Sequence, residues 1–197
     1  MPCDRPVVLF GGASATAPGV KLKGRNDFAA RLETLFRRAC RGKVDFQLVA
    51  GRGHDLLEDA DAILARIAAA PSSLLIMHYP TSDVADGAAV PVMVGTYERI
   101  LDACHAQGGL CLIGGQLPVD QFTAGLSSRQ LELERIAMER FGSAYVALYR
   151  HFQSERGQKR LMTRLDSGDG RHLNDFGHEL LHELYARALI RLAGTGK

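Results

Sequence analysis

The clearest chemical signal in the sequence is a glycine-rich loop at residues 167–172, directly before a predicted helix. Asp169 and His172 stand three positions apart within it. That spacing lets the carboxylate hold one nitrogen of the imidazole while the other nitrogen faces outward, the arrangement that prepares a histidine to act as a general base. Asp-x-x-His alone is a common pattern, and the alternative is that these residues only form the entry to the helix.

A serine that could serve as the nucleophile follows the first apolar run. Gly11 and Gly12 allow a sharp turn after that run and would bring Ser14 to the edge of a sheet. A serine hydroxyl is a weak nucleophile until a positioned base takes its proton, so Ser14 and His172 form a chemical pair. Taken alone, Ser14 is better explained as a turn or N-cap residue.

A competing motif lies on the last predicted helix. His178, Glu179 and His182 form a literal His-Glu-x-x-His pattern, which is typical of zinc peptidases. The glycine and third histidine of the longer zinc pattern are missing, and only 15 residues follow His182. Leu180 and Leu181 place the core-facing side between the histidines, which predicts that both lie on the flank of the helix. A zinc metallopeptidase is therefore only a remote alternative.

The elements that must position these residues follow a regular alternation. Short apolar runs predict strands, and apolar residues at helical spacing predict a helix after each one. Strands that are apolar throughout and followed by helices indicate a parallel sheet covered on both faces. The sequence thus predicts one three-layer α/β/α domain over residues 1–197, with a central five-stranded parallel sheet whose strands lie at 7–10, 46–49, 74–77, 110–113 and 145–148.

Ligands bind beyond the carboxyl ends of the strands in such sheets. The segments that follow four of the predicted strands should therefore meet at one edge, together with the segment that enters the last helix. These segments are 11–19, 50–55, 78–83, 114–118 and 166–175. Ser14 and His172 both fall within them.

In this order the motifs resemble those of the GDSL/SGNH hydrolase superfamily, whose fold is flavodoxin-like. Gly12-Ala13-Ser14 stands where the family has Gly-Asp-Ser, and Gly51-Arg52-Gly53 matches the glycine loop after the second strand. Pro80-Thr81-Ser82-Asp83 occupies the place of Gly-x-Asn-Asp. The segment from Asp169 to Gly177 matches the extended Asp-Gly-x-His-Leu-Asn-x-x-Gly motif and is the most specific of the four.

The resemblance implies a role for each matching residue. Ser14 is the implied nucleophile, His172 the general base and Asp169 the residue that orients it. The implied oxyanion hole consists of the Ser14 N–H, the N–H of Gly53 (or, alternatively, Gly51) and a side chain at the family's asparagine position.

This chain has Ser82 at that asparagine position, which is its main departure from the family pattern. A serine hydroxyl can donate a hydrogen bond but reaches less far than an amide. Loss of one oxyanion donor costs about 10²–10³ in rate. His78 and Tyr79, which directly precede this segment, are alternative donors.

The resemblance implies a serine esterase or acyl hydrolase that forms an acyl-enzyme on Ser14 and needs no metal or organic cofactor. The implied substrate is a small-molecule or carbohydrate ester, such as an acetylated sugar. An O-acyltransferase on the same fold is one alternative. A catalytically degenerate binding protein is another, motivated by Ala13, Pro80 and Ser82. Acyl length, the alcohol part of the ester and the oligomeric state are left open.

Composition, charge and cysteine spacing argue against several other classes of protein. The net charge of +2 is too small to indicate a surface that binds nucleic acid. No apolar run approaches the ~18 residues of a membrane span. The first residues lack the pattern of a signal peptide, which predicts a cytoplasmic protein. The four cysteines, at positions 3, 40, 104 and 111, include no Cys-x-x-Cys pair. Their spacing predicts neither a disulfide framework nor a zinc cage, and Cys104 and Cys111 are expected to be core residues.

Overall fold

A parallel sheet forms the centre of the computed structural model, which describes residues 7–12, 28–50, 54–69, 74–79, 81–154 and 159–195. Five strands pair in the order β2-β1-β3-β4-β5, every neighbour parallel to the next. The strands are β1 (Val7–Gly12), β2 (Asp45–Ala50), β3 (Leu74–His78), β4 (Leu110–Gly114) and β5 (Tyr145–Val146). The predicted five-stranded parallel sheet is confirmed.

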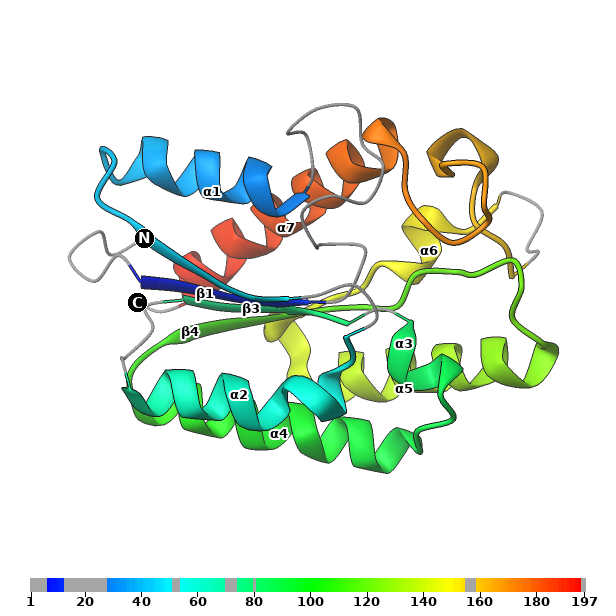
Figure 1. Cartoon of the computed structure of the whole chain (residues 1–197), viewed down its shortest axis with the longest axis horizontal. Helices are drawn as coiled ribbons and strands as arrows, with labels where there is room; N and C mark the ends of the chain where they lie inside the picture. Colours follow the sequence, from blue (N-terminus) through cyan, green and yellow to red (C-terminus); the bar gives the residue numbers. More distant parts are fainter. Residues whose placement is uncertain are drawn as a thin grey trace.

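Helices cover both faces of this sheet, which confirms the three-layer architecture. Figure 1 shows α1 and α7 on one face and α2, α4 and α5 on the other. The helices are α1 (Phe28–Ala39), α2 (Leu56–Ala69), α3 (Ser82–Ala85), α4 (Val90–Ala106), α5 (Ala124–Phe141), α6 (Tyr149–Phe152) and α7 (Asp175–Thr195), with 3-10 turns η1 (Gly142–Ala144) and η2 (Thr163–Leu165). None of the helices, as far as the structure describes them, has the length and apolar composition needed to cross a membrane.

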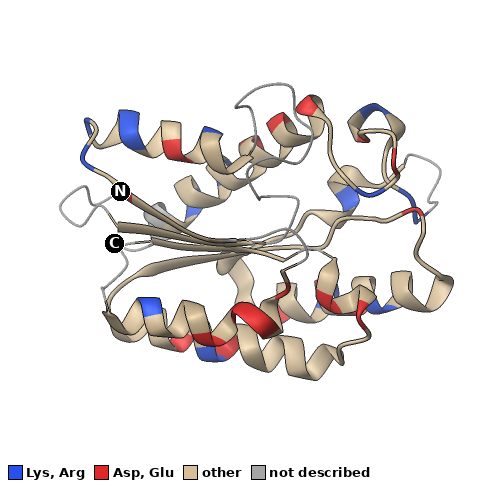
Figure 2. Ribbon diagram, viewed as in Figure 1, with Lys and Arg blue, Asp and Glu red and all other residues tan. Residues whose placement is uncertain are grey.

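Two hydrophobic cores lie on opposite faces of the sheet because side chains alternate along each strand. Val8 and Phe10 of β1 pack towards α1 and α7, whereas Leu9 packs towards α2 and α4. Asp45, at the start of β2, is the only Asp, Glu, Lys or Arg in the five strands. Figure 2 accordingly shows the charged residues mostly on helices and connecting loops. A sheet buried on both faces leaves no place for an unpaired charge.

One buried carboxylate ties the ends of β4 and β5 together. Glu134 of α5, only 7% exposed, accepts hydrogen bonds from the backbone N–H of Gln116 (2.9 Å), Leu148 (2.9 Å) and Tyr149 (3.0 Å) and from the Tyr145 hydroxyl (2.5 Å). Leu148 and Tyr149 thus bond to a side chain instead of extending the ladder. This explains why β5 ends at Val146, two residues before its predicted end.

The structure corrects the prediction for the cysteines. Cys104, in the last turn of α4, and Cys111, in β4, form a disulfide across a Cα–Cα distance of 6.9 Å. Both side chains are buried in the core, as predicted, but the absence of a disulfide was wrong. The spacing of the cysteines matches no known disulfide motif and so gave no signal for this bond. The two residues meet because the α4–β4 connection folds back on itself.

Removal of the Glu134 carboxylate should destabilise the whole fold. We expect Glu134→Ala to lower the free energy of unfolding by at least about 3 kcal/mol, because four donors lose their acceptor in a buried place. The matched control is Glu139→Ala, also on α5, whose exposed ion pair with Arg135 should contribute less than about 0.5 kcal/mol. Urea unfolding measures both values, and equal losses would contradict this role of Glu134.

Candidate functional site

The loop that carries the predicted base is folded around one aspartate. The Asp166 carboxylate accepts the backbone N–H of Gly168 (3.0 Å), Asp169 (3.2 Å) and Gly170 (3.0 Å). Gly168 and Gly170 have φ values of 103° and 67°, which side-chain-bearing residues rarely adopt. A bridge between Asp166 and Leu173 closes the loop at its base. The loop therefore has a defined shape before any ligand binds.

Asn174 fastens this loop to α7. Its side-chain NH₂ donates to the carbonyls of Arg164 (2.9 Å) and Asp166 (3.0 Å). Its side-chain oxygen accepts the N–H of Gly177, in the first turn of α7, at 3.0 Å. The loop at residues 166–173 and the helix that follows it thus share one anchor.

Asp169 and His172 form the predicted pair. The Nδ1 atom of His172 lies 2.6 Å from Oδ2 of Asp169, and Oδ1 of the same carboxylate accepts the backbone N–H of His172 at 2.8 Å. The carboxylate therefore holds both the ring and the backbone of the histidine. The His172 side chain is 24% exposed and that of Asp169 is 52% exposed, so the pair lies at the surface.

The hydrogen bonds also keep Asp169 ionised. Partial burial acts to raise the pKa of Asp169, but the bonds from His172 and from the Arg171 N–H outweigh it and lower the pKa to about 2. An ionised carboxylate only accepts hydrogen bonds. Nδ1 of a neutral His172 therefore carries the proton, and Nε2 carries the lone pair that a general base needs.

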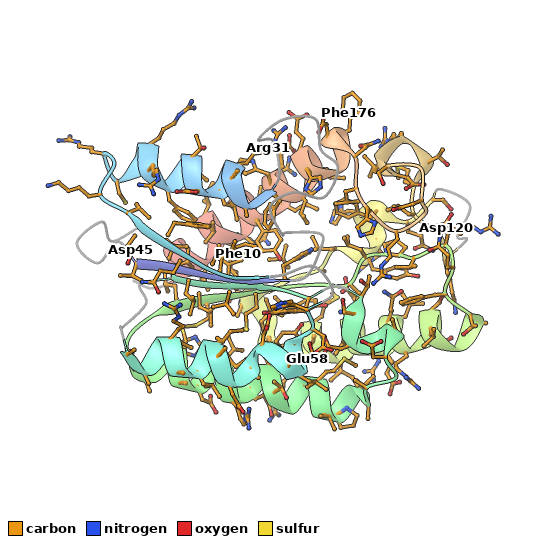
Figure 3. The ribbon with its side chains drawn as sticks, viewed as in Figure 1. Phe10, Arg31, Asp45, Glu58, Asp120 and Phe176 are labelled. Atoms are coloured by element: carbon orange, nitrogen blue, oxygen red, sulfur yellow. A yellow bond between two sulfur atoms is a disulfide. The ribbon has the colours of Figure 1, made fainter. Side chains whose placement is uncertain are left out.

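The segment that follows β4 packs against the loop at residues 166–173. The N–H of Asp120 donates to the Gly170 carbonyl at 2.9 Å, and the Asp120 carboxylate accepts the N–H of Leu161 at 2.8 Å. Figure 3 labels Asp120 at the side of the molecule opposite Asp45, the first residue of β2. The same view shows Phe176, 70% exposed at the start of α7, pointing away from the body of the protein. The carboxyl ends of the strands and the loop at residues 166–173 therefore lie at one side of the molecule.

Ser82, the residue at the family's asparagine position, begins α3 beside the start of α2. The two helices are joined by Asp83, whose carboxylate accepts the N–H of Leu56 (2.9 Å) and of Leu57 (3.1 Å). Ser82 is 5% exposed, and its hydroxyl makes no hydrogen bond to any described residue. Burial raises the pKa of Asp83 to about 6, although the two N–H groups act to lower it.

Of the two alternative donors, Tyr79 is committed elsewhere, whereas Nε2 of His78 is buried and has no hydrogen-bond partner among the described residues. The Tyr79 hydroxyl donates to Asp59 at 2.7 Å, on the α2 side of the sheet. His78 is fully buried on the α7 side, with Nδ1 2.7 Å from the Tyr185 hydroxyl. Burial, assisted by the nearby His178, lowers the pKa of His78 to about 3 and keeps the ring neutral. Gly114 makes room for this contact, because a Cβ there would overlap both rings.

Several predicted site residues fall outside the described ranges. They are Ser14, Gly51, Gly53, Ala13 and Pro80. Of the predicted catalytic residues, the structure thus places Asp169 and His172 and brings them together. Of the predicted oxyanion donors, it places Ser82.

The His-Glu-x-x-His motif does not produce a metal centre in the described part of the chain, where no three His, Cys, Asp or Glu side chains converge on a possible metal. His178 is 5% exposed and belongs to the core-facing side of α7, whereas Glu179 is exposed and His182 is half-buried. The prediction that both histidines lie on the flank of the helix is therefore wrong for His178.

Two features of the site were missed by the sequence analysis. Asp166 shapes the loop at residues 166–173, and the sequence Asp-Ser-Gly-Asp-Gly is a signal for such a side-chain-to-backbone turn. His54 lies with Nδ1 2.9 and 3.1 Å from the two oxygens of Asp59. Their spacing of five residues matches no common motif, so the pair had no sequence signal.

Comparisons place this architecture among known folds. The sequence matches no protein-family model, and no curated protein matches it. TesA superposes with a TM-score of 0.71 over 94% of this chain and 99% of its own, at 18% identity. A member of the lipolytic protein G-D-S-L family from Veillonella parvula gives 0.70 over 94% and 98%, at 17% identity. The acetyl xylan esterase AlAXEase gives 0.69 over 92% and 98%, at 13% identity. The chain therefore has the fold of these proteins, and the expected SGNH fold is confirmed.

The buried Asp83 should make stability depend on pH. Its pKa rises from an ordinary 3.8 to about 6 on folding, so the folded state favours the protonated form. The resulting stabilisation is fully present below the unfolded pKa and is lost as the pH rises through about 6. Asp83→Asn cannot ionise, so we expect it to gain on the order of 2 kcal/mol relative to wild type between about pH 4 and pH 7.5. Urea unfolding at both pH values measures this gain, and a constant or opposite difference would contradict it.

Proposed function

We propose that this chain is a serine-dependent ester hydrolase with Ser14 as nucleophile, His172 as general base and Asp169 as the residue that orients it. The observation that carries the proposal is the 2.6 Å contact between His172 Nδ1 and Asp169 Oδ2, in a loop beside the start of α7. Ser14 follows the last residue of β1 by two positions. The fold shared with lipolytic proteins and esterases supports the same chemistry.

The reaction follows from the ionised Asp169 and from the lone pair on Nε2 of His172. Ser14 Oγ attacks the ester carbonyl carbon while its proton passes to Nε2 of His172. The ionised Asp169 stabilises the imidazolium that forms. The tetrahedral intermediate then collapses, the leaving alcohol takes the proton from His172, and an acyl group remains on Ser14. Water, deprotonated by His172, releases the acid in a second step of the same kind.

The negative charge on the carbonyl oxygen needs donors at the same edge. We assign the N–H groups of Ser14 and Gly53, with the Ser82 hydroxyl as third donor. Support for Ser82 comes from its place at the start of α3, held beside α2 by Asp83, and from a hydroxyl that no described residue uses. A free hydroxyl can rotate towards a new acceptor, which a hydroxyl already bonded to protein does at a cost.

A carbohydrate or other small ester is the proposed substrate class. The chain shares its fold with an enzyme named as an acetyl xylan esterase, which supports an acetylated sugar as the substrate. No metal or organic cofactor takes part in the proposed steps. The serine is the nucleophile, the imidazole transfers the protons, and the hydrogen-bond donors stabilise the negative charge.

The triad is tested by hydrolysis of a short-chain nitrophenyl ester. We expect Ser14→Ala and His172→Gln each to lower kcat at least about 10³-fold, and Asp169→Asn about 10²-fold. The aspartate effect is smaller because water can partly replace a carboxylate that is half exposed. The matched control is His151→Ala, an exposed histidine of α6 that should keep full activity. Wild-type rates for Ser14→Ala would refute the nucleophile assignment.

The third oxyanion donor is tested at Ser82. We expect Ser82→Ala to lower kcat by about 10²-fold with little change in KM, because the lost bond acts on the transition state. The control is Thr81→Val, which removes the neighbouring hydroxyl and should stay within about threefold of wild type. A Ser82→Ala variant with wild-type kcat would show that another group donates.

A further inference from the structure

A second imidazole is held by a carboxylate next to the glycine loop that follows β2. The Asp59 carboxylate is bound by Nδ1 of His54, at 2.9 and 3.1 Å, and by the Tyr79 hydroxyl at 2.7 Å. Burial and the neighbouring Asp59 raise the pKa of Tyr79, so its hydroxyl keeps its proton and donates. The inner side of the histidine is thus fixed by a buried network.

The outer side of His54 is accessible. Its side chain is 45% exposed, whereas that of Asp59 is 8% exposed. When the ring is unprotonated, donation from Nδ1 to the carboxylate leaves the lone pair on Nε2, which then acts as a hydrogen-bond acceptor. No described residue bonds to Nε2.

Helix capping does not explain this arrangement. The N–H groups of Leu56 and Leu57 are taken by Asp83, and that of Glu58 is taken by Asp55 at 2.8 Å. The first turn of α2 is therefore satisfied without His54. The imidazole is held in place, yet its outer nitrogen serves no contact within the described protein.

The strand order places this imidazole at the sheet edge where β1, β2 and β3 end. β1 lies between β2 and β3, and Gly12, its last residue, pairs with Ala50 on one side and His78 on the other. His54 follows the end of β2 by four residues, and its network reaches Tyr79, the first residue after β3. The network thus spans the end of β1, two residues before Ser14.

We propose that Nε2 of His54 accepts a hydrogen bond from a free hydroxyl in the alcohol part of the substrate, so that the preferred substrates are esters of polyhydroxylated alcohols such as partly acylated sugars. The proposal rests on the ester hydrolase function proposed above. The lone pair accepts a hydrogen bond, and a hydroxyl group is a donor that carries no charge. The carboxylates of Asp55, Asp59 and Asp83 around the start of α2 disfavour an anionic substrate. Figure 2 shows further acidic residues along α2.

The test compares two acetate esters that differ only in whether their other hydroxyl groups are free or methylated. One is a mono-O-acetylated methyl xyloside with its other hydroxyls free, and the other is the same ester with those hydroxyls methylated. Release of acetate gives kcat/KM for each. We expect wild type to prefer the free-hydroxyl ester by roughly tenfold and His54→Ala to lose that preference, with kcat/KM on the methylated ester within about threefold of wild type.

Two further variants keep the result interpretable. His54→Gln retains an acceptor oxygen and should keep part of the preference, and it also leaves Asp59 a hydrogen-bond donor if His54→Ala folds poorly. His105→Ala, an exposed histidine of α4, should keep all of the preference. An unchanged preference in His54→Ala, or an equal loss on both esters, would overturn the proposal. If Ser14→Ala still cleaved both esters at wild-type rates, the failure would lie in the proposed function instead.

Discussion

Parallel pairing of β1 with both β2 and β3 is the constraint on which the site depends. Parallel strands end at the same edge, so Gly12, Ala50 and His78, the last residues of β1, β2 and β3, are neighbours in space although they lie far apart in the sequence. Burial of both faces makes this pairing stable, because the strands carry almost no charge and two hydrophobic cores form from alternate side chains. The chemistry of the edge then depends on which polar residues the connecting segments bring to it.

Carboxylates that accept backbone N–H groups give those segments their shape. Asp166 folds the loop at residues 166–173, Asp83 joins the starts of α2 and α3, and Glu134 joins the segments after β4 and β5. Each one satisfies donors that no strand or helix could pair. Asp83 retains this role although burial raises its pKa, so the connection between α2 and α3 is kept at some cost in stability at neutral pH. The same principle, applied to a side chain, orients His172 through Asp169 and His54 through Asp59.

Local patterns in the sequence predicted the local parts of the structure. Apolar runs identified all five strands, since a strand buried on both faces has no polar alternation, and the close match at 169–177 identified the Asp169–His172 pair. The long-range contacts had no such signal. Glu134 binds residues 18 positions before and up to 15 positions after it, and the contact of Asp83 with Leu56 spans 27 positions. The Cys104–Cys111 bond and the burial of His178 depend on how helices pack, which spacing alone does not determine.

The central claim is that Ser14 is a nucleophile activated by His172, and covalent labelling tests it most directly. A nitrophenyl alkylphosphonate reacts when a serine oxygen attacks phosphorus and expels nitrophenolate, which leaves a phosphonyl group on the serine. Peptide mass spectrometry then locates that group without any knowledge of the natural substrate. We predict one phosphonyl group per chain, on Ser14, formed far more slowly in His172→Gln. Labelling of another residue, no labelling, or an equal rate in His172→Gln would contradict the account.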